Sequence, residues 1–237
     1  MTRHGVVLCE GYHDRAVWSG WLTARGWKSM RPLSGKALDP RGRELPKGAF
    51  AFRRGHAFVT LVPCGGWTEI LRLFALEAQE AFVESGSPNA VDFIAACFDA
   101  DIAGADHGQS IRDRWRKATG HAPPPRDDWR HEGIAVHVVR FTAGEARWRS
   151  SLDGLVARSF AEAYPARWRN VEAWLESRED KPEPSKEAMW SVMAGWFPEQ
   201  GESFLQHGIW HDQSIRDRLT AHLDELGITR VVEAMEA

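Results

Sequence analysis

Two short apolar runs, each followed at once by acidic residues, constrain the fold of this chain most strongly. The first run is residues 6–9, which Glu10 follows, and the second is residues 93–98, which Asp99 and Asp101 follow. Both runs have the length and composition of buried strands. Open α/β sheets bind their ligands at the carboxyl ends of parallel strands. We therefore expect the three acids to meet at one edge of a parallel sheet.

Carboxylates that are packed together repel one another unless a cation lies among them. Ligand sets made only of oxygen atoms suit Mg²⁺ or Mn²⁺. The sequence therefore predicts a Mg²⁺ or Mn²⁺ site at Glu10, Asp99 and Asp101. Asp14 follows Glu10 by four residues and is a further candidate ligand. It also has a purely structural interpretation, as the N-cap of the first helix.

These two motifs resemble those of the Toprim domain, in which a strand is followed by Glu-Gly and a later strand by Asp-x-Asp. Type IA and type II topoisomerases, bacterial primases, small RNA-maturing nucleases and the OLD (overcoming lysogenisation defect) nucleases share this domain. The form found at residues 10–14, with a second acid four residues after the glutamate, is most similar to the OLD-type branch. A Gly65-Gly66 turn between a strand and a helix matches that branch as well. The resemblance covers roughly residues 4–146 and implies a Rossmannoid parallel sheet flanked by helices.

The resemblance also implies a set of site residues. Glu10, Asp99 and Asp101 would be catalytic, and together with Asp14 they would bind metal. In the OLD-type branch further acids follow the fourth strand, and Glu145 is the matching residue here. Its alternative interpretation is an acid in the first turn of a helix, favoured by the helix dipole. The implied chemistry is two-metal hydrolysis of phosphodiester bonds.

The hydrophobic pattern divides the chain into two parts. It predicts strands at residues 5–9, 57–62, 91–98 and 134–139, and helices at residues 13–25, 67–84 and 109–118. Ser110, with Asp113 three residues later, is expected to cap the last of these helices. A loop and a hairpin are inserted over about residues 31–56, and the pattern is helical after residue 146. We therefore predict a Toprim-like domain over residues 1–146 and a Trp-rich helical extension over residues 147–237.

A short segment of the chain recurs. Residues 107–114 (HGQSIRDR) are repeated at residues 211–218 (HDQSIRDR) with a single difference. One interpretation is two helices that begin in the same way, and the other is a pair of basic helix faces that bind phosphate. The 12 tryptophans have two interpretations too. They either pack helices against one another or stack on nucleic-acid bases.

Nucleic acid is the expected substrate, yet the net charge of −3 gives no overall basic field. Contact with a polyanion then depends on local basic clusters. We predict that Arg53 and Arg54 in the hairpin, and Arg112 and Arg116 on the helix after the acids, bind the phosphate backbone. Other basic residues in the two clusters are Arg41, Arg43, Lys47, Arg114 and Lys117. The alternative for either cluster is an ordinary solvated surface.

The three cysteines, Cys9, Cys64 and Cys97, show no C-x-x-C spacing. They are expected to be reduced and buried, as in cytoplasmic proteins. The sequence shows no signal-like segment at its start and no apolar stretch of the length needed to cross a membrane. We therefore expect a soluble cytoplasmic protein without membrane contact.

The leading functional expectation is a metal-dependent nuclease that acts on DNA or RNA. OLD nucleases carry an ATPase domain, and this sequence has no ATPase signature, so the resemblance points to a separate ATPase subunit as a partner or to independent action. Standalone Toprim proteins resemble components of prokaryotic defence systems. One alternative is a catalytically weak Toprim module that binds protein or nucleic acid. Another is a receiver-like phospho-acceptor domain, which would need a lysine after a later strand, where residues 139–141 read Val-Arg-Phe. Assembly into a homo-oligomer is left open.

Overall fold

The structure, a computed structural model, describes residues 3–30, 38–39, 42–85, 87, 90–100, 106–142, 150–177, 195–197 and 201–236. Contacts within the chain form two compact units. The sheet unit contains residues 1–98, 104–139 and 228–237. The helical unit contains residues 99–103 and 140–227. The predicted division into a domain over residues 1–146 and an extension over residues 147–237 stays a prediction.

The sheet has seven strands in the order β2-β3-β4-β1-β5-β7-β6. Their bounds are β1 Arg3–Cys9, β2 Lys28–Ser29, β3 Phe50–Arg54, β4 Ala57–Pro63, β5 Phe93–Asp99, β6 Asp128–His131 and β7 Ile134–Phe141. β1 runs parallel to both of its neighbours, β4 and β5. The outer pairs β2–β3, β3–β4 and β6–β7 are antiparallel. The predicted α/β class, with parallel strands at the centre of the sheet and helices around it, is confirmed.

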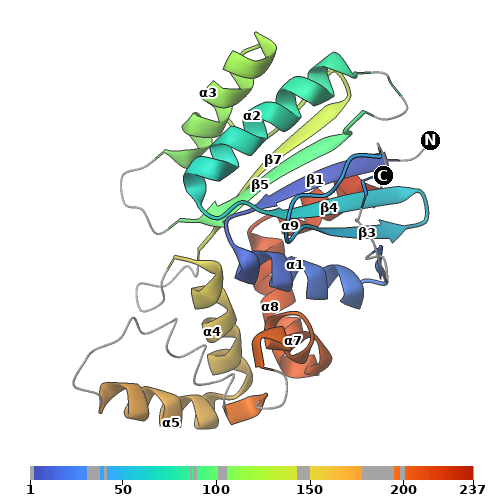
Figure 1. The fold of residues 1–237 in the computed structure, drawn as a ribbon. Coiled ribbons are helices and arrows are strands. Elements are labelled where there is room, and N and C mark those ends of the chain that lie inside the picture. The colour runs from blue at the N-terminus through green and yellow to red at the C-terminus, as the bar shows by residue number, and fades with distance from the viewer. Residues whose placement is uncertain are drawn as a thin grey trace. The chain divides into compact units, whose positions relative to one another are not determined.

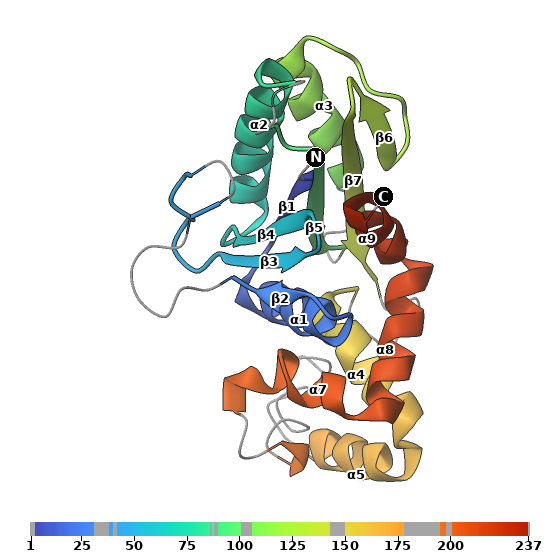
Figure 2. The ribbon, with the colours of Figure 1, turned by 90° about the vertical axis from the view of Figure 1, so that its right-hand side faces the viewer.

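Among the described residues of the sheet unit, four helices cover the two faces of this sheet. They are α1 Tyr12–Ala24, α2 Trp67–Val83, α3 His107–Thr119 and α9 Ile228–Glu236. α2 and α3 lie on one face, and α1 and α9 lie on the other (Figures 1 and 2). Phe74, Phe98 and Trp115 are almost fully buried in the core beneath α2 and α3. Burial of one such aromatic side chain contributes about 2–3 kcal/mol to folding.

The path of the chain creates a switch point between β1 and β5. The helix after β1 lies on one face of the sheet, whereas the helices after β4 and β5 lie on the opposite face. β4 and β5 are placed on either side of β1. The strand order therefore reverses beside the carboxyl ends of β1 and β5. In open α/β sheets this is the place where ligands bind.

Most predicted elements of the sheet unit are confirmed with small shifts in their ends. The hairpin of β3 and β4 forms as expected. The predicted cap of α3 is wrong. Asp106 caps this helix, since its carboxylate accepts a hydrogen bond from the Gln109 N–H at 2.8 Å. Ser110 instead donates its hydroxyl to the Asp106 carbonyl at 3.2 Å, and the helix begins two residues before the predicted start.

The described part of the helical unit contains α4 Leu152–Ala163, α5 Pro165–Glu176, η1 Gly201–Leu205, α7 Gly208–His211 and α8 Gln213–Glu225. The prediction of helical structure after residue 146 is confirmed for these residues. α4 packs against both α5 and α8. The His222 ring of α8 lies 3.0 Å from the Glu162 carboxylate of α4, which ties the two helices together.

The repeated segments form two helix starts with the same side-chain hydrogen bonds. Gln109 in α3 and Gln213 in α8 each bond the aspartate four residues later, at 2.9 and 2.8 Å. Ile111 and Ile215 are both fully buried. The caps differ, because Asp212 occupies the one position where the segments diverge and accepts from the Ile215 N–H at 3.1 Å. The repeat therefore gives the same side-chain hydrogen bonds within two helices, but the interpretation of two similarly capped helix starts is wrong, because α3 begins at His107 and α8 begins at Gln213, the residue that aligns with Gln109. Phosphate binding by either helix stays a prediction.

Candidate functional site

Glu10 lies directly after β1, at the carboxyl edge of the sheet. The register aligns Cys9 with Pro63 at the end of β4 and with Cys97 near the end of β5. The three parallel strands therefore end at almost the same level. Glu10 directly follows β1, and Asp99 is the last residue of the neighbouring strand β5.

The Gly65-Gly66 turn between β4 and α2 fixes the backbone of Glu10. The N–H groups of both glycines donate to the Glu10 carbonyl, each at 2.9 Å. Gly66 has φ of 123°, a conformation that residues with a side chain rarely adopt. The turn therefore depends on glycine, and it holds the residue after β1 in one backbone position.

Asp14 lies in the first turn of α1 and is buried. Its carboxylate accepts a hydrogen bond from the Gly11 N–H at 2.6 Å. Gly11 is the N-cap of α1, so Asp14 caps the helix from its third position rather than as the N-cap itself. A carboxylate has two oxygen atoms with about four lone-pair positions. The hydrogen bond from Gly11 is thus compatible with a metal contact by the same group.

Asp99 has a structural role that the sequence did not reveal. Its carboxylate accepts a hydrogen bond from the Leu152 N–H, the first residue of α4, at 2.9 Å. The Ser151 hydroxyl caps the same helix by accepting from the Gly154 N–H at 3.1 Å. Within the helical unit, Asp99 therefore satisfies one of the N–H groups that a helix start leaves without a partner.

Two of the five predicted metal ligands, Asp101 and Glu145, lie outside the described residues. The structure consequently represents the predicted set only by Glu10, Asp14 and Asp99. No three His, Cys, Asp or Glu side chains within the described ranges are grouped closely enough to hold a metal ion. The metal site stays a prediction.

An aromatic cluster that sequence reasoning missed lies at the starts of α2 and α3. Trp67, Phe98 and His107 pack together, with ring centroids 4.4 to 4.8 Å apart. His107 is buried. The sequence carries two signals for this cluster, because Trp67 directly follows the Gly-Gly turn and His107 opens the repeated segment. The cluster joins the end of β5 to both helices and stiffens this edge of the sheet unit.

The three cysteines are free thiols, as predicted. Cys9 and Cys97 are buried, and burial raises the pKa of both well above its usual value. Cys64 is partly buried, and burial raises its pKa to about 12. Burial therefore disfavours the thiolate, the nucleophilic form, at all three cysteines.

The predicted phosphate-binding arginines of α3 have different surroundings. The Arg112 side chain is only 12% exposed, and it pairs with Asp106 at 3.7 Å and Asp127 at 3.6 Å. Arg116 is 63% exposed and pairs with Asp113 at 3.3 Å. Arg112 thus restrains the start of α3, whereas Arg116 faces solvent.

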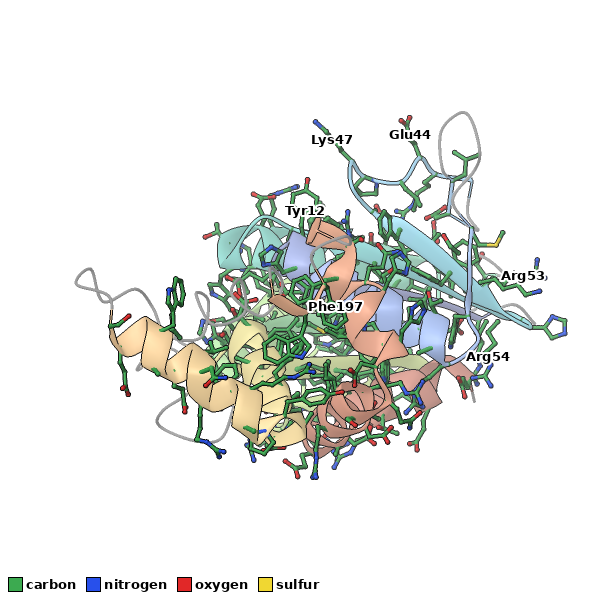
Figure 3. The ribbon with its side chains drawn as sticks, turned by 90° about the horizontal axis from the view of Figure 1, so that it is seen from below. Tyr12, Glu44, Lys47, Arg53, Arg54 and Phe197 are labelled. Atoms are coloured by element: carbon green, nitrogen blue, oxygen red, sulfur yellow. The ribbon has the colours of Figure 1, made fainter. Side chains whose placement is uncertain are left out.

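Arg53 and Arg54 do not share the edge where Glu10 lies. They are the last two residues of β3 and directly precede the turn that leads into β4. Because β4 runs parallel to β1, this turn is at the amino ends of the strands. Strands of seven residues separate the two edges by roughly 20 Å. Both arginines extend from the end of the hairpin (Figure 3), and Arg54 forms an ion pair with Glu236 of α9.

Comparisons with known proteins support the fold and add no function. No protein-family model matches the chain, and no curated protein matches it. The crystal structure of a hypothetical protein from Pyrococcus horikoshii OT3 is similar over 100% of both chains, with a TM-score of 0.71 and 16% sequence identity. At this identity the likeness shows a shared α/β fold. None of the described helices has the length and apolar character needed to cross a membrane.

Proposed function

We propose that this protein is a metal-dependent nuclease that hydrolyses phosphodiester bonds of DNA or RNA with Mg²⁺ or Mn²⁺. The observation that carries the proposal is the position of Glu10 and Asp99. Glu10 directly follows β1, and Asp99 is the last residue of the adjacent strand β5, at the switch point of the sheet. The likeness of residues 10–14 and 99–101 to the two Toprim motifs supports the same function.

The residues present suit a hard divalent cation. The ligands would be the carboxylates of Glu10, Asp14, Asp99, Asp101 and Glu145, and Mg²⁺ and Mn²⁺ prefer oxygen ligands of this kind. Backbone N–H groups already orient two of these carboxylates, at Asp14 and Asp99. Bound metal would supply charge neutralisation at the phosphate and an activated water. The contribution of the chain is to hold the ligands in fixed positions.

The proposal extends to partners and location. Of the two arginines predicted to bind phosphate from α3, Arg116 is the one that faces solvent, so it is the one accessible to the backbone of a nucleic acid. Three free thiols fit a reducing, cytoplasmic location. A separate ATPase subunit and a role in prokaryotic defence rest on the family resemblance alone.

The test is a cleavage assay with purified protein on plasmid, single-stranded DNA and tRNA. We expect cleavage with Mg²⁺ or Mn²⁺ and none with EDTA. Glu10→Gln should abolish cleavage. Glu69→Gln, the same substitution at a partly exposed position of α2, is the matched control and should cleave as the wild type does. A wild-type protein that cleaves none of the three substrates with either metal contradicts the proposal.

A second candidate function is a catalytically weak module that binds protein or nucleic acid. It is favoured by the hydrogen bonds of Asp14 and Asp99, which give both acids a structural role without metal. This module would bind its partner equally well after Glu10→Gln, and the wild type would show no metal-dependent cleavage. The same assay, combined with a binding measurement, therefore distinguishes the two functions.

A further inference from the structure

Tyr12 is a large aromatic residue at the surface, two residues after Glu10. It is the first residue of α1, and 56% of it is exposed. Aromatic residues usually bury most of their surface, and those that stay exposed beside a site are available to a ligand. The exposure of Tyr12 therefore indicates a role other than packing within the protein.

The Tyr12 ring is held in place from the protein side. It lies so close to Gly48 that a Cβ atom there would come within 2.8 Å of the ring. Gly48 has φ of 84°, so two separate constraints favour glycine at this position. The same hypothetical Cβ would lie 3.4 Å from Pro63, the last residue of β4. The ring is thus seated at the carboxyl edge of the sheet.

A stacked arginine supports the ring. The Arg15 guanidinium lies 5.0 Å from the Tyr12 ring centroid and 4.0 Å from the Phe50 ring centroid. It also donates a hydrogen bond to the Gly48 carbonyl at 2.5 Å. Tyr12, Arg15 and Phe50 therefore form a layered stack whose outermost member is the exposed tyrosine, and the ring loses little freedom when a ligand binds to it.

Positive charge accompanies the exposed ring. Arg15 lies beneath it, and Lys47, the neighbour of Gly48 in the chain, is exposed. Figure 3 shows Lys47 reaching outward from the loop before β3 and Tyr12 at the start of α1. An aromatic face combined with nearby cations is the pattern by which proteins hold single-stranded nucleic acid.

We propose that Tyr12 is a stacking platform for one base of a single-stranded nucleic acid, with Arg15 supporting the ring from beneath and the exposed Lys47 facing the adjacent phosphates. The inference rests on the proposed nuclease function and specifies its substrate class. A base within a duplex is already paired and stacked, and it reaches an external ring only after a costly extrusion. The platform therefore selects single strands, or single-stranded segments of a folded RNA, over duplex.

The test measures binding in EDTA, where cleavage does not interfere. Fluorescence anisotropy of the full chain with labelled single-stranded DNA, single-stranded RNA and duplex DNA, each about 12 nucleotides long, gives the three dissociation constants. We expect both single strands to bind more tightly than the duplex, and the ratio between RNA and DNA identifies the preferred one. Tyr12→Ala should weaken single-strand binding at least about fivefold.

Two further variants and a control make the test specific to the ring. Tyr12→Phe keeps the aromatic face and should bind within about twofold of the wild type. Tyr12→Leu keeps apolar contact with the protein but has no aromatic face, and it should resemble Tyr12→Ala. Trp174→Ala, which removes an exposed aromatic residue from α5, should leave binding unchanged. A 2-aminopurine base in the strand should be quenched by the wild type and less by Tyr12→Leu.

Several results overturn the inference. Wild-type affinity for single strands in both Tyr12→Ala and Tyr12→Leu would overturn it. A loss of affinity in Tyr12→Phe as large as that in Tyr12→Ala would overturn it too. So would binding of the duplex as tightly as of single strands. A wild type that binds no single strand overturns it as well, while the cleavage assay separately decides the nuclease function. Tyr12-dependent binding without any metal-dependent cleavage supports the platform and contradicts the nuclease function.

Discussion

The two edges of the parallel strands β1 and β5 use their polar groups in different ways. At the amino edge, the His4 N–H donates to the Asp92 carboxylate at 2.7 Å, and the Asp92 N–H donates to the His4 carbonyl at 2.7 Å. The Asp92 carbonyl accepts from the Ala135 N–H of β7 at 2.8 Å. One aspartate therefore ties three neighbouring strands together.

At the carboxyl edge, the two glycine N–H groups bond the carbonyl of Glu10 and not its carboxylate. The backbone there is fixed by the turn. The comparison teaches that an acidic residue at a strand end can contribute to the fold through its side chain, through its backbone, or through both. Asp92 contributes both its side chain and its backbone to the sheet, and the Gly65-Gly66 turn binds the backbone of Glu10.

The largest difference between the edges should be in catalysis. We expect Glu10→Gln and Asp99→Asn to lower the rate of metal-dependent cleavage by at least about a hundredfold, because each removes a negative charge that would balance the charge of the metal ion. Asp92→Asn should retain the wild-type rate within about twofold. Initial cleavage rates at saturating metal measure this. An equal loss in Asp92→Asn would remove the functional distinction between the edges.

The amino edge should show a pH dependence of stability through His4. Burial lowers the pKa of His4 from 6.5 to about 4, with Asp39 opposing the shift and Arg43 adding to it. Below pH 6.5 the unfolded chain takes up this proton before the folded protein does. The free energy of unfolding should therefore fall between about pH 6.5 and pH 4, by up to about 3 kcal/mol.

The measurement is urea unfolding of the wild type and His4→Gln across this pH range. Glu77 acts in the opposite direction, because burial raises its pKa to about 7 and its contribution to stability falls as the pH rises from 4.5 to 7. That effect is common to both proteins and cancels in their difference. Parallel pH profiles for the wild type and the variant would show that His4 does not titrate in this way.

Removal of the acid at the amino edge should also destabilise the fold. Asp92→Ala leaves the N–H of His4 without its acceptor, at a cost of about 1–3 kcal/mol in the free energy of unfolding. Glu10→Gln should change that free energy by less than about 0.5 kcal/mol. Urea denaturation of both variants checks the contrast. A larger loss in Glu10→Gln would show that its carboxylate supports the fold.

The smallest expected effect separates the two roles of Asp99. Asp99→Ala removes the acceptor of the Leu152 N–H and should cost about 0.5–2 kcal/mol, as the loss of a helix cap does. Asp99→Asn keeps an oxygen acceptor and should cost clearly less, although both variants should lose cleavage. If Asp99→Asn is as unstable as Asp99→Ala, the charge and not the acceptor holds the start of α4.

The sequence was sufficient for features that depend on local pattern. Apolar runs located the central strands, and the acids after them could be assigned to one edge of the sheet because parallel strands end together. Hydrogen bonds between distant residues could not be predicted. Asp99 and Leu152 are 53 residues apart, and nothing in the sequence near either of them indicates the partner.

Some local features were hidden because two residues compete for one role. Asp106 and Ser110 both suit a helix cap, and only the structure shows that Asp106 caps α3. The short strands β2 and β6 have too few residues to show alternation. The grouping of α9 with the sheet unit depends on contacts such as the hydrogen bond from Arg3 to the Ala234 carbonyl, across 231 residues of chain.

The central claim is that the carboxyl edge binds a divalent metal, and Mn²⁺ binding measured by electron paramagnetic resonance tests it most directly. A titration of the purified protein reports the Mn²⁺ bound by the loss of the free-ion signal. We expect the wild type and Asp92→Asn to bind Mn²⁺ with the same affinity, and Asp99→Asn/Asp101→Asn to bind it at least about tenfold more weakly. Equal Mn²⁺ affinity in the double variant and the wild type would contradict a metal site at this edge.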